Sequence, residues 1–235
     1  MQIGKLTAQL DALDLGSRDR VRSAAGPAML WSLGMLFFVA ISASAQEPAQ
    51  KAAGVPRVLL TVHMASTDLR WLDIKMGAFL SKSEDKFIPL TDYNFAANFA
   101  DELVETLADD QRAAWVGAKP DEQKVLEACF GPNWRKQKTV TPPAVEADRL
   151  LLIKANYFAM TQAVVHRLYL VVVIQMVDRT TGQVLWTKGF NENMKLPRKL
   201  EELQADNQKG LKEALNKLAE QIVPKIKQHL AHQKI

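Results

Sequence analysis

Three stretches decide the fold: RLLLIKANYFAM (residues 149–160), VVHRLYLVVVIQMV (164–177) and QVLWTKGF (183–190). All three are rich in branched and aromatic residues, which favours β-strands. Between the last two lies DRTTG (178–182), whose final glycine suits the positive φ of a tight turn. The sequence therefore predicts three successive strands that end in an antiparallel hairpin. Because the second stretch is continuously apolar around Leu170 to Ile174, we expect it to be central and covered on both faces.

Two amphipathic helices are expected to back this sheet. One covers residues 92–110, with Thr91 or Asp92 as its cap, and the other covers residues 203–231, where Pro224 should kink or divide it. Each has an apolar stripe at helical spacing. The stripe of the first helix comprises Phe95, Phe99, Leu103 and Leu107.

Shorter elements complete the predicted domain. They are a strand over 57–64, an extended piece over 71–80, a short strand over 112–116, a helix over 120–129 and a loop over 133–143. The sequence thus predicts a single α/β domain over residues 57–235. It is expected to contain a mixed sheet of about five strands with an antiparallel C-terminal hairpin, covered by amphipathic helices.

The N-terminal segment is typical of a signal peptide. Residues 29–41 (MLWSLGMLFFVAI) form a short uncharged apolar run, and three arginines precede it. Ala43-Ser44-Ala45 is an A-x-A cleavage site, so we expect a signal peptide over residues 1–45 and a flexible leader over 46–56.

This segment predicts a periplasmic, secreted protein of a bacterial cell envelope. The alternative is an uncleaved anchor in the inner membrane formed by residues 28–45, since an uncharged, mostly apolar run of eighteen residues is just long enough for a tilted span. A lipid anchor is not expected, because the residue after the cleavage site is Gln46 and not cysteine.

Composition argues against nucleic-acid binding. Without the first 45 residues, 26 Lys and Arg stand against 23 Asp and Glu, and no dense basic block is present. The only cysteine, Cys129, excludes an intramolecular disulfide. It is expected to be a buried structural thiol rather than a reactive or dimer-forming one.

No catalytic, cofactor-binding or metal-binding residue is predicted. The sequence has no G-x-S-x-G, P-loop, G-x-G-x-x-G or H-E-x-x-H motif. His63 and His166 are expected at strand ends, and His229 and His232 on the surface of the last helix. Enzymatic activity is left open, but the absence of motifs favours binding over catalysis.

A possible partner-binding patch lies in the loop NWRKQK. There Trp134 is expected to be an exposed aromatic side chain beside Arg135, Lys136 and Lys138. Such a patch could contact a partner protein or an anionic envelope component such as a lipid head group or a glycan. Trp186, in the hairpin, is expected to pack against the last helix instead.

The C-terminal part resembles a group of bacterial envelope proteins. LYLVVVIQMVDRTTGQVLWTKGF (residues 168–190) followed by a long helix rich in Ala and Leu is similar to the end of the curli-secretion lipoprotein. It is also similar to the outer-membrane activators of penicillin-binding proteins and to the N-terminal domain of the Tol system's periplasmic propeller protein. This group is non-enzymatic and acts through protein contacts. Its lipid anchor and its pore-forming hairpins are not implied here, because the sequence lacks the residues for both.

The resemblance implies an exported, non-catalytic binding or assembly factor of the cell envelope, whose partners are envelope proteins or an anionic envelope component. Two alternatives stay open. One is a periplasmic carrier of a small ligand or lipid, which would need a pocket between the sheet and the helices. The other is a hydrolase without a recognised motif. The oligomeric state cannot be derived from the sequence.

Overall fold

The computed structural model describes residues 54–76, 81–131, 133–162, 165–196 and 200–235. The predicted signal peptide (1–45), the alternative anchor (28–45) and most of the predicted leader (46–56) lie outside these residues. In the described part of the chain, no helix combines the length and the apolar character that a membrane span requires.

The C-terminal strands are β5 (Arg149–Gln162), β6 (Val165–Asp178) and β7 (Val184–Lys195), and they form the antiparallel hairpin arrangement that the sequence predicts. Gly182 has a φ of 70°, as its place at the end of the turn requires. The Asp178 carboxylate accepts hydrogen bonds from the Thr181 amide and hydroxyl at 2.9 and 3.0 Å. Because these bonds hold the turn closed, the register of the hairpin is fixed locally.

The other strands extend this unit on the far edge of β5. They are β1 (Arg57–Met64), β2 (Asp68–Met76), β3 (Ser81–Pro89) and β4 (Ala114–Gly117). β1 runs parallel to the first half of β5 and β2 runs parallel to its second half, so the two lie end to end along one edge. β4 adds to β1 in parallel, and β3 adds to β2 in antiparallel orientation. The described residues form a mixed sheet of seven strands, which confirms the predicted α/β class and adds two strands to the expected number.

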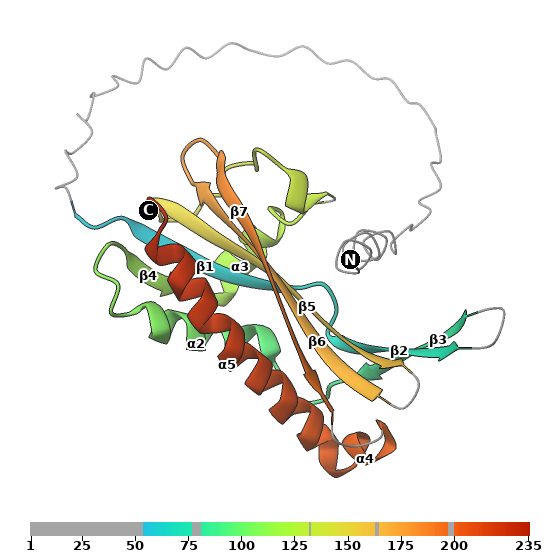
Figure 1. Ribbon diagram of the computed structural model, residues 1–235. Helices are drawn as coiled ribbons and strands as arrows, with labels where there is room; N and C mark the ends of the chain where they lie inside the picture. Colours follow the sequence, from blue (N-terminus) through green and yellow to red (C-terminus); the bar gives the residue numbers. More distant parts are fainter. Residues whose placement is uncertain (1–53, 77–80, 132, 163–164, 197–199) are drawn as a thin grey trace, which may run out of the picture. The chain divides into compact units, whose positions relative to one another are not determined.

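Two long helices cover one face of this sheet, which we call the helix face (Figure 1). The described helices are α2 (Phe95–Leu107), α3 (Pro120–Glu127), α4 (Leu200–Gln204) and α5 (Lys209–Ala231), with 3-10 turns at Trp134–Lys136 and Asp206–Gln208. The apolar stripes of α2 and α5 both point at the sheet, as predicted.

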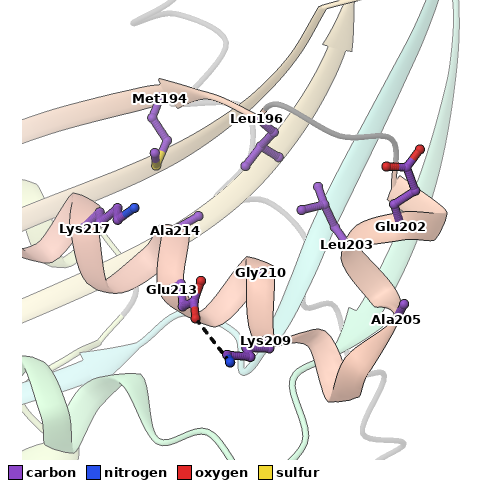
Figure 2. Close-up of a pocket in the computed structure, with 10 residues that line it drawn as sticks. All are labelled: Met194, Leu196, Glu202, Leu203, Ala205, Lys209, Gly210, Glu213, Ala214 and Lys217. Atoms are coloured by element: carbon purple, nitrogen blue, oxygen red, sulfur yellow. Dashed lines mark ion pairs between the residues drawn. The ribbon is translucent and has the colours of Figure 1, made fainter.

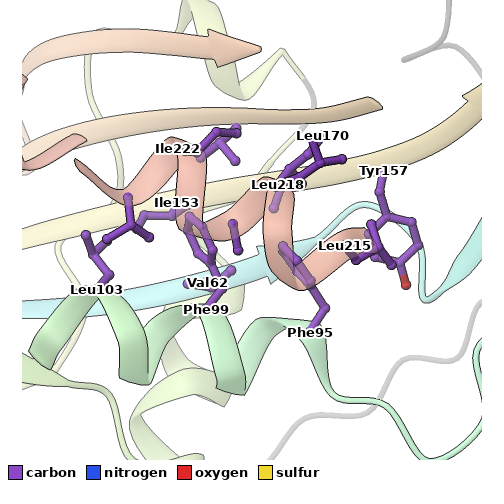
Figure 3. Close-up of a cluster of buried hydrophobic side chains, with 14 of the residues drawn as sticks. Val62, Phe95, Phe99, Leu103, Ile153, Tyr157, Leu170, Leu215, Leu218 and Ile222 are labelled. Atoms are coloured by element: carbon purple, nitrogen blue, oxygen red, sulfur yellow. The ribbon is translucent and has the colours of Figure 1, made fainter. Parts of the chain in front are cut away.

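The main core lies between these helices and the helix face (Figure 3). Phe99 and Leu103 of α2 meet Leu218 and Ile222 of α5 above Ile153 of β5, and all five side chains are fully or almost fully buried. Burial of a leucine, isoleucine or phenylalanine side chain stabilises a fold by about 1.5–3 kcal/mol. This layer therefore dominates the stability of the domain.

The opposite face of the sheet, the second face, is covered only in part. α3 and the loop over residues 133–147 close a smaller core over the end of the sheet where Leu59, Leu150 and Val177 lie. β6 was predicted to be covered on both faces, and this is wrong for half of its length. Its helix-facing side chains from Leu168 to Met176 are fully buried, but Tyr169 and Val171 on the second face are only half-buried. The reason is that an antiparallel meander needs only one packed face.

Three local predictions need correction. The cap of α2 is Asn94, whose side chain accepts from the Ala97 amide at 3.1 Å, and not Thr91 or Asp92. α5 runs through Pro224 without division, because buried side chains on either side hold it against the sheet. The break before α5 lies at Asn207 and Gln208, both with positive φ.

Candidate functional site

The fold separates the aromatic side chain of the predicted patch in the basic loop from the cations of that patch. Trp134 is only 2% exposed, so its prediction as an exposed aromatic side chain was wrong. Asn133 adopts a positive φ of 60° and starts a 3-10 turn that brings the indole into the second-face core, where it lies against Phe130 at 5.4 Å. Buried Gln175 of β6 donates to the Trp134 carbonyl at 2.9 Å and secures the turn.

The cations of the same loop, Arg135, Lys136 and Lys138, are exposed. The fold therefore leaves a basic loop surface without its aromatic partner. A role of these three side chains in binding an anionic component stays a prediction.

His63 and His166 do not meet. His63 lies on the second face, stacked on Phe130 at 4.8 Å, and burial lowers its pKa, helped by the nearby Lys154 ammonium. His166 lies on the helix face, with its Nδ1 2.8 Å from the Thr161 hydroxyl. Their strand partners on β5, Lys154 and Thr161, are about 23 Å apart along the strand. The two imidazoles therefore cannot act on one substrate.

His229 is not the frayed surface residue that was expected. Its ring lies edge-on to Trp186 at 5.1 Å and near Phe190 at 6.0 Å, which also confirms that Trp186 packs against the last helix. Burial lowers the pKa of His229, and the nearby Lys188 and His232 side chains lower it further. In the described residues, no group of three or more His, Cys, Asp or Glu side chains could hold a metal ion.

Cys129 is buried in the second-face core, as predicted. Burial raises the pKa of its thiol, so the reactive thiolate is disfavoured.

The uncovered half of the second face is a surface that the sequence did not predict. It lies toward the β2–β3 end of the sheet, and we call it the open sheet face. Cross-strand register assigns to it Arg70, Leu72, Ile74, Asp85, Phe87, Asn156, Phe158, Met160, Arg167, Tyr169, Val171, Asn191, Asn193 and Lys195.

Aromatic side chains form the centre of the open sheet face. Phe158 and Tyr169 are cross-strand partners whose rings stack at 4.8 Å with an interplanar angle of 7°. Phe87 on the edge strand β3 is 61% exposed, the most exposed large apolar side chain in the described residues. Half-buried Leu72 and Met160 lie in the next row on one side of the stack, and half-buried Val171 lies on the other side.

The charges around this centre are mostly positive. Arg70 is paired with Asp85, whose carboxylate oxygen it contacts at 2.5 Å. Arg167 and Lys195 are directly opposite each other on β6 and β7, and both are exposed. The Arg167 guanidinium donates to the Asn193 side-chain oxygen at 2.8 Å. The open sheet face thus combines stacked aromatic rings with a pair of cations.

A pocket of about 380 Å³ lies elsewhere, where the end of β7 meets α4 and the start of α5 (Figure 2). Its apolar lining includes Leu196 and Leu203, both buried. Figure 2 shows charged side chains at the rim, where the Lys209 ammonium lies 4.0 Å from the Glu213 carboxylate. The pocket is therefore an apolar space with a charged entrance.

No family model matches the chain, and no curated protein matches it. Similar solved structures include protein XCC0632 from Xanthomonas campestris, with 9% identity and a TM-score of 0.43 over 75% of this chain and 85% of that one. They also include the hypothetical protein CT253 from Chlamydia trachomatis, with 12% identity and a TM-score of 0.42 over 73% of this chain and 95% of that one. A third is lipoprotein GNA1162 from Neisseria meningitidis, with 15% identity and a TM-score of 0.37 over 74% of this chain and 99% of that one. A bacterial lipoprotein is thus among the structures to which this chain is similar.

Proposed function

We propose that this chain is an exported, non-catalytic binding or assembly factor of the bacterial cell envelope, and that its partners dock on the open sheet face. The observation that carries the proposal is one row of the open sheet face, in which exposed Phe87 and the stacked rings of Phe158 and Tyr169 lie on either side of Arg70. Single exposed apolar residues are common on soluble proteins, but a contiguous apolar surface with a polar border is typical of an interaction site.

The rigidity of the open sheet face supports docking by a protein. Its side chains project from β2, β3, β5, β6 and β7, which are joined by continuous strand pairing. A partner that covers this surface would therefore lose little conformational entropy on this side of the interface. Aromatic side chains, which are enriched at the centres of protein interfaces, stand at its middle.

Export is the second part of the proposal. It rests on the apolar run, the arginines and the A-x-A site of residues 1–45. N-terminal sequencing of the protein from its native membrane and periplasmic fractions tests it. A mature start at Gln46 supports a periplasmic protein, and an intact Met1 in the inner membrane supports the anchored alternative.

Site-specific photo-crosslinking tests docking. A photoreactive amino acid replaces Phe87 or Tyr169 in the chain as the cell makes it, and adducts are identified by mass spectrometry. Val125 on α3 is the matched control, because it is an exposed apolar residue outside the open sheet face. We expect adducts with a defined envelope protein from positions 87 and 169 and not from 125. Equal yields from all three positions would contradict the proposal.

A carrier of a small ligand or lipid is the second candidate, because a pocket does lie between the sheet and the helices. Its volume of about 380 Å³ falls within the range of small-molecule sites. A carrier should release a bound molecule when the purified protein is denatured.

Gly210 offers a variant for this test. A Cβ there would lie 3.2 Å from the Leu203 side chain, so Gly210→Leu would fill part of the pocket. Release of a molecule from the unchanged protein and its loss in Gly210→Leu would favour the carrier. Release of nothing from either would count against the carrier.

A further inference from the structure

We infer that the partner presents an acidic and apolar protein segment, which places a carboxylate between Arg167 and Lys195 and an apolar side chain on the Phe158–Tyr169 stack. This inference rests on the proposed function, because it assigns the chemistry of the partner that docks on the open sheet face.

The cation pair is the first argument. Residues directly opposite each other in an antiparallel pair have Cβ atoms about 4.5–5.5 Å apart, and like charges in this arrangement are destabilising. Arg167 and Lys195 are such a pair. Among the described residues, neither Arg167 nor Lys195 forms an ion pair with an acidic side chain, whereas Arg70 on the same face pairs with Asp85. A carboxylate that arrives from outside would relieve this repulsion.

The position of the aromatic stack is the second argument. Tyr169 follows Arg167 by two residues on β6, so both side chains leave the same face about 7 Å apart. An extended partner segment repeats its own side chains on one face at the same spacing of two residues. A segment with an acidic residue and an apolar residue at alternate positions therefore matches both features at once.

The remaining charges of the open sheet face point the same way. Asp85, the acid that register assigns to this face in the described residues, is already neutralised by Arg70. A basic partner would meet Arg167 and Lys195 without a compensating acid. An uncharged apolar partner would cover both cations and remove them from water, which costs free energy unless they are paired. Charge complementarity thus selects an acidic partner.

Three synthetic peptides test the inference. All three have phenylalanine at every second position, and the positions between the phenylalanines are Glu in one peptide, Gln in the second and Lys in the third. Their binding to the full-length chain is measured by fluorescence anisotropy at low and high salt. We expect the Glu peptide to bind at least tenfold more tightly than the Gln peptide, with an advantage that shrinks as salt rises. The Lys peptide should bind most weakly. Equal binding of the Glu and Lys peptides would overturn the inference.

Charge reversal locates the contact. Arg167→Glu with Lys195→Glu should weaken the Glu peptide at least tenfold and should make the Lys peptide the better ligand. Lys124→Glu is the matched control, because Lys124 is an exposed cation of α3 and lies outside both the open sheet face and the basic loop. Arg167→Gln with Lys195→Gln keeps the backbone and removes the charge, so it should equalise the Glu and Gln peptides. An effect of Lys124→Glu as large as that of the double reversal would refute the location.

Other occupants give other results. Binding of vesicles that contain anionic lipid, lost on double charge reversal, together with no preference among the peptides, would assign this face to a membrane surface and overturn the inference. Crosslinked protein adducts from position 87 without any preference for the Glu peptide would leave the docking function standing and remove only the acidic partner.

Discussion

Two phenylalanines show how the packed helix face differs from the open sheet face. Phe99 on α2 is 1% exposed and stacks on Phe95 at 5.5 Å, whereas Phe87 on β3 is 61% exposed. Replacement of a buried phenylalanine by alanine costs about 3–5 kcal/mol, because apolar burial is lost and a cavity remains. The same replacement at an exposed edge-strand position changes stability by about 1 kcal/mol or less. Phe99→Ala should therefore destabilise the domain by at least about 2 kcal/mol more than Phe87→Ala.

Urea unfolding followed by tryptophan fluorescence measures this difference for the purified protein. The midpoint of Phe87→Ala should stay close to that of the unchanged chain, and the midpoint of Phe99→Ala should fall clearly. A loss of more than about 2 kcal/mol for Phe87→Ala would refute the reasoning, because Phe87 would then be held by contacts that its exposure excludes. If Phe87 is free for a partner, Phe87→Ala should impair crosslinking and not folding.

Three further predictions follow from local geometry. The Arg112 guanidinium donates to the carbonyls of Leu230, Ala231 and Gln233 at 3.0–3.1 Å and pairs with Asp110. Arg112→Ala should therefore lower the free energy of unfolding by about 1–2 kcal/mol and speed amide hydrogen exchange at the end of α5. Unchanged exchange there would contradict this role. A Cβ on Gly182 would lie 2.0 Å from the Val140 carbonyl oxygen at a φ of 70°, so Gly182→Ala should destabilise the fold by at least about 2 kcal/mol. A Cβ on Gly117 would have its nearest contact at 3.8 Å, so Gly117→Ala should not lower the free energy of unfolding in urea by more than about 1 kcal/mol. The pKa of His229 is lowered in the folded state, so the unfolded chain takes up the proton first as pH falls below about 6.5, and stability present above that pH is lost on acidification. His229→Phe should therefore reduce the loss of urea stability between pH 8 and pH 5.5, and an unchanged loss would show that His229 does not titrate in this way.

The strands of the C-terminal half could be predicted because their burial is visible in the sequence. β6 carries a continuous apolar run, and Gly182 stands where a turn needs positive φ. The second face of the same strand was predicted wrongly, because an apolar run does not say whether a second layer arrives to cover it. Only the positions of α3 and the 133–147 loop decide how far that cover extends.

β3 could not be found from its sequence. SKSEDKFIP shows no apolar alternation, because β3 is an edge strand that joins the sheet by main-chain pairing with β2. Of its side chains, Ile88 enters the core. Phe87, one residue earlier, points to the other face, and only the strand register assigns it there.

The prediction that Trp134 is exposed was wrong for a different reason. Its neighbours in sequence are charged, which favours exposure, but the positive φ of Asn133 turns the indole inward and leaves Arg135 and Lys136 outside. Asparagine tolerates positive φ better than most residues, but it adopts this conformation only at some positions, so the turn is seen only in the structure, where Gln175 donates to the Trp134 carbonyl.

The most direct test of docking on the open sheet face is photo-crosslinking from position 169 in the cells that make the protein, with and without charge reversal at Arg167 and Lys195. The predicted result is a discrete adduct with one envelope protein that is lost in the double variant and kept in Lys124→Glu. Docking on this face would be contradicted if the adduct persisted unchanged in the double variant and a photoreactive residue at position 125 gave equal adducts.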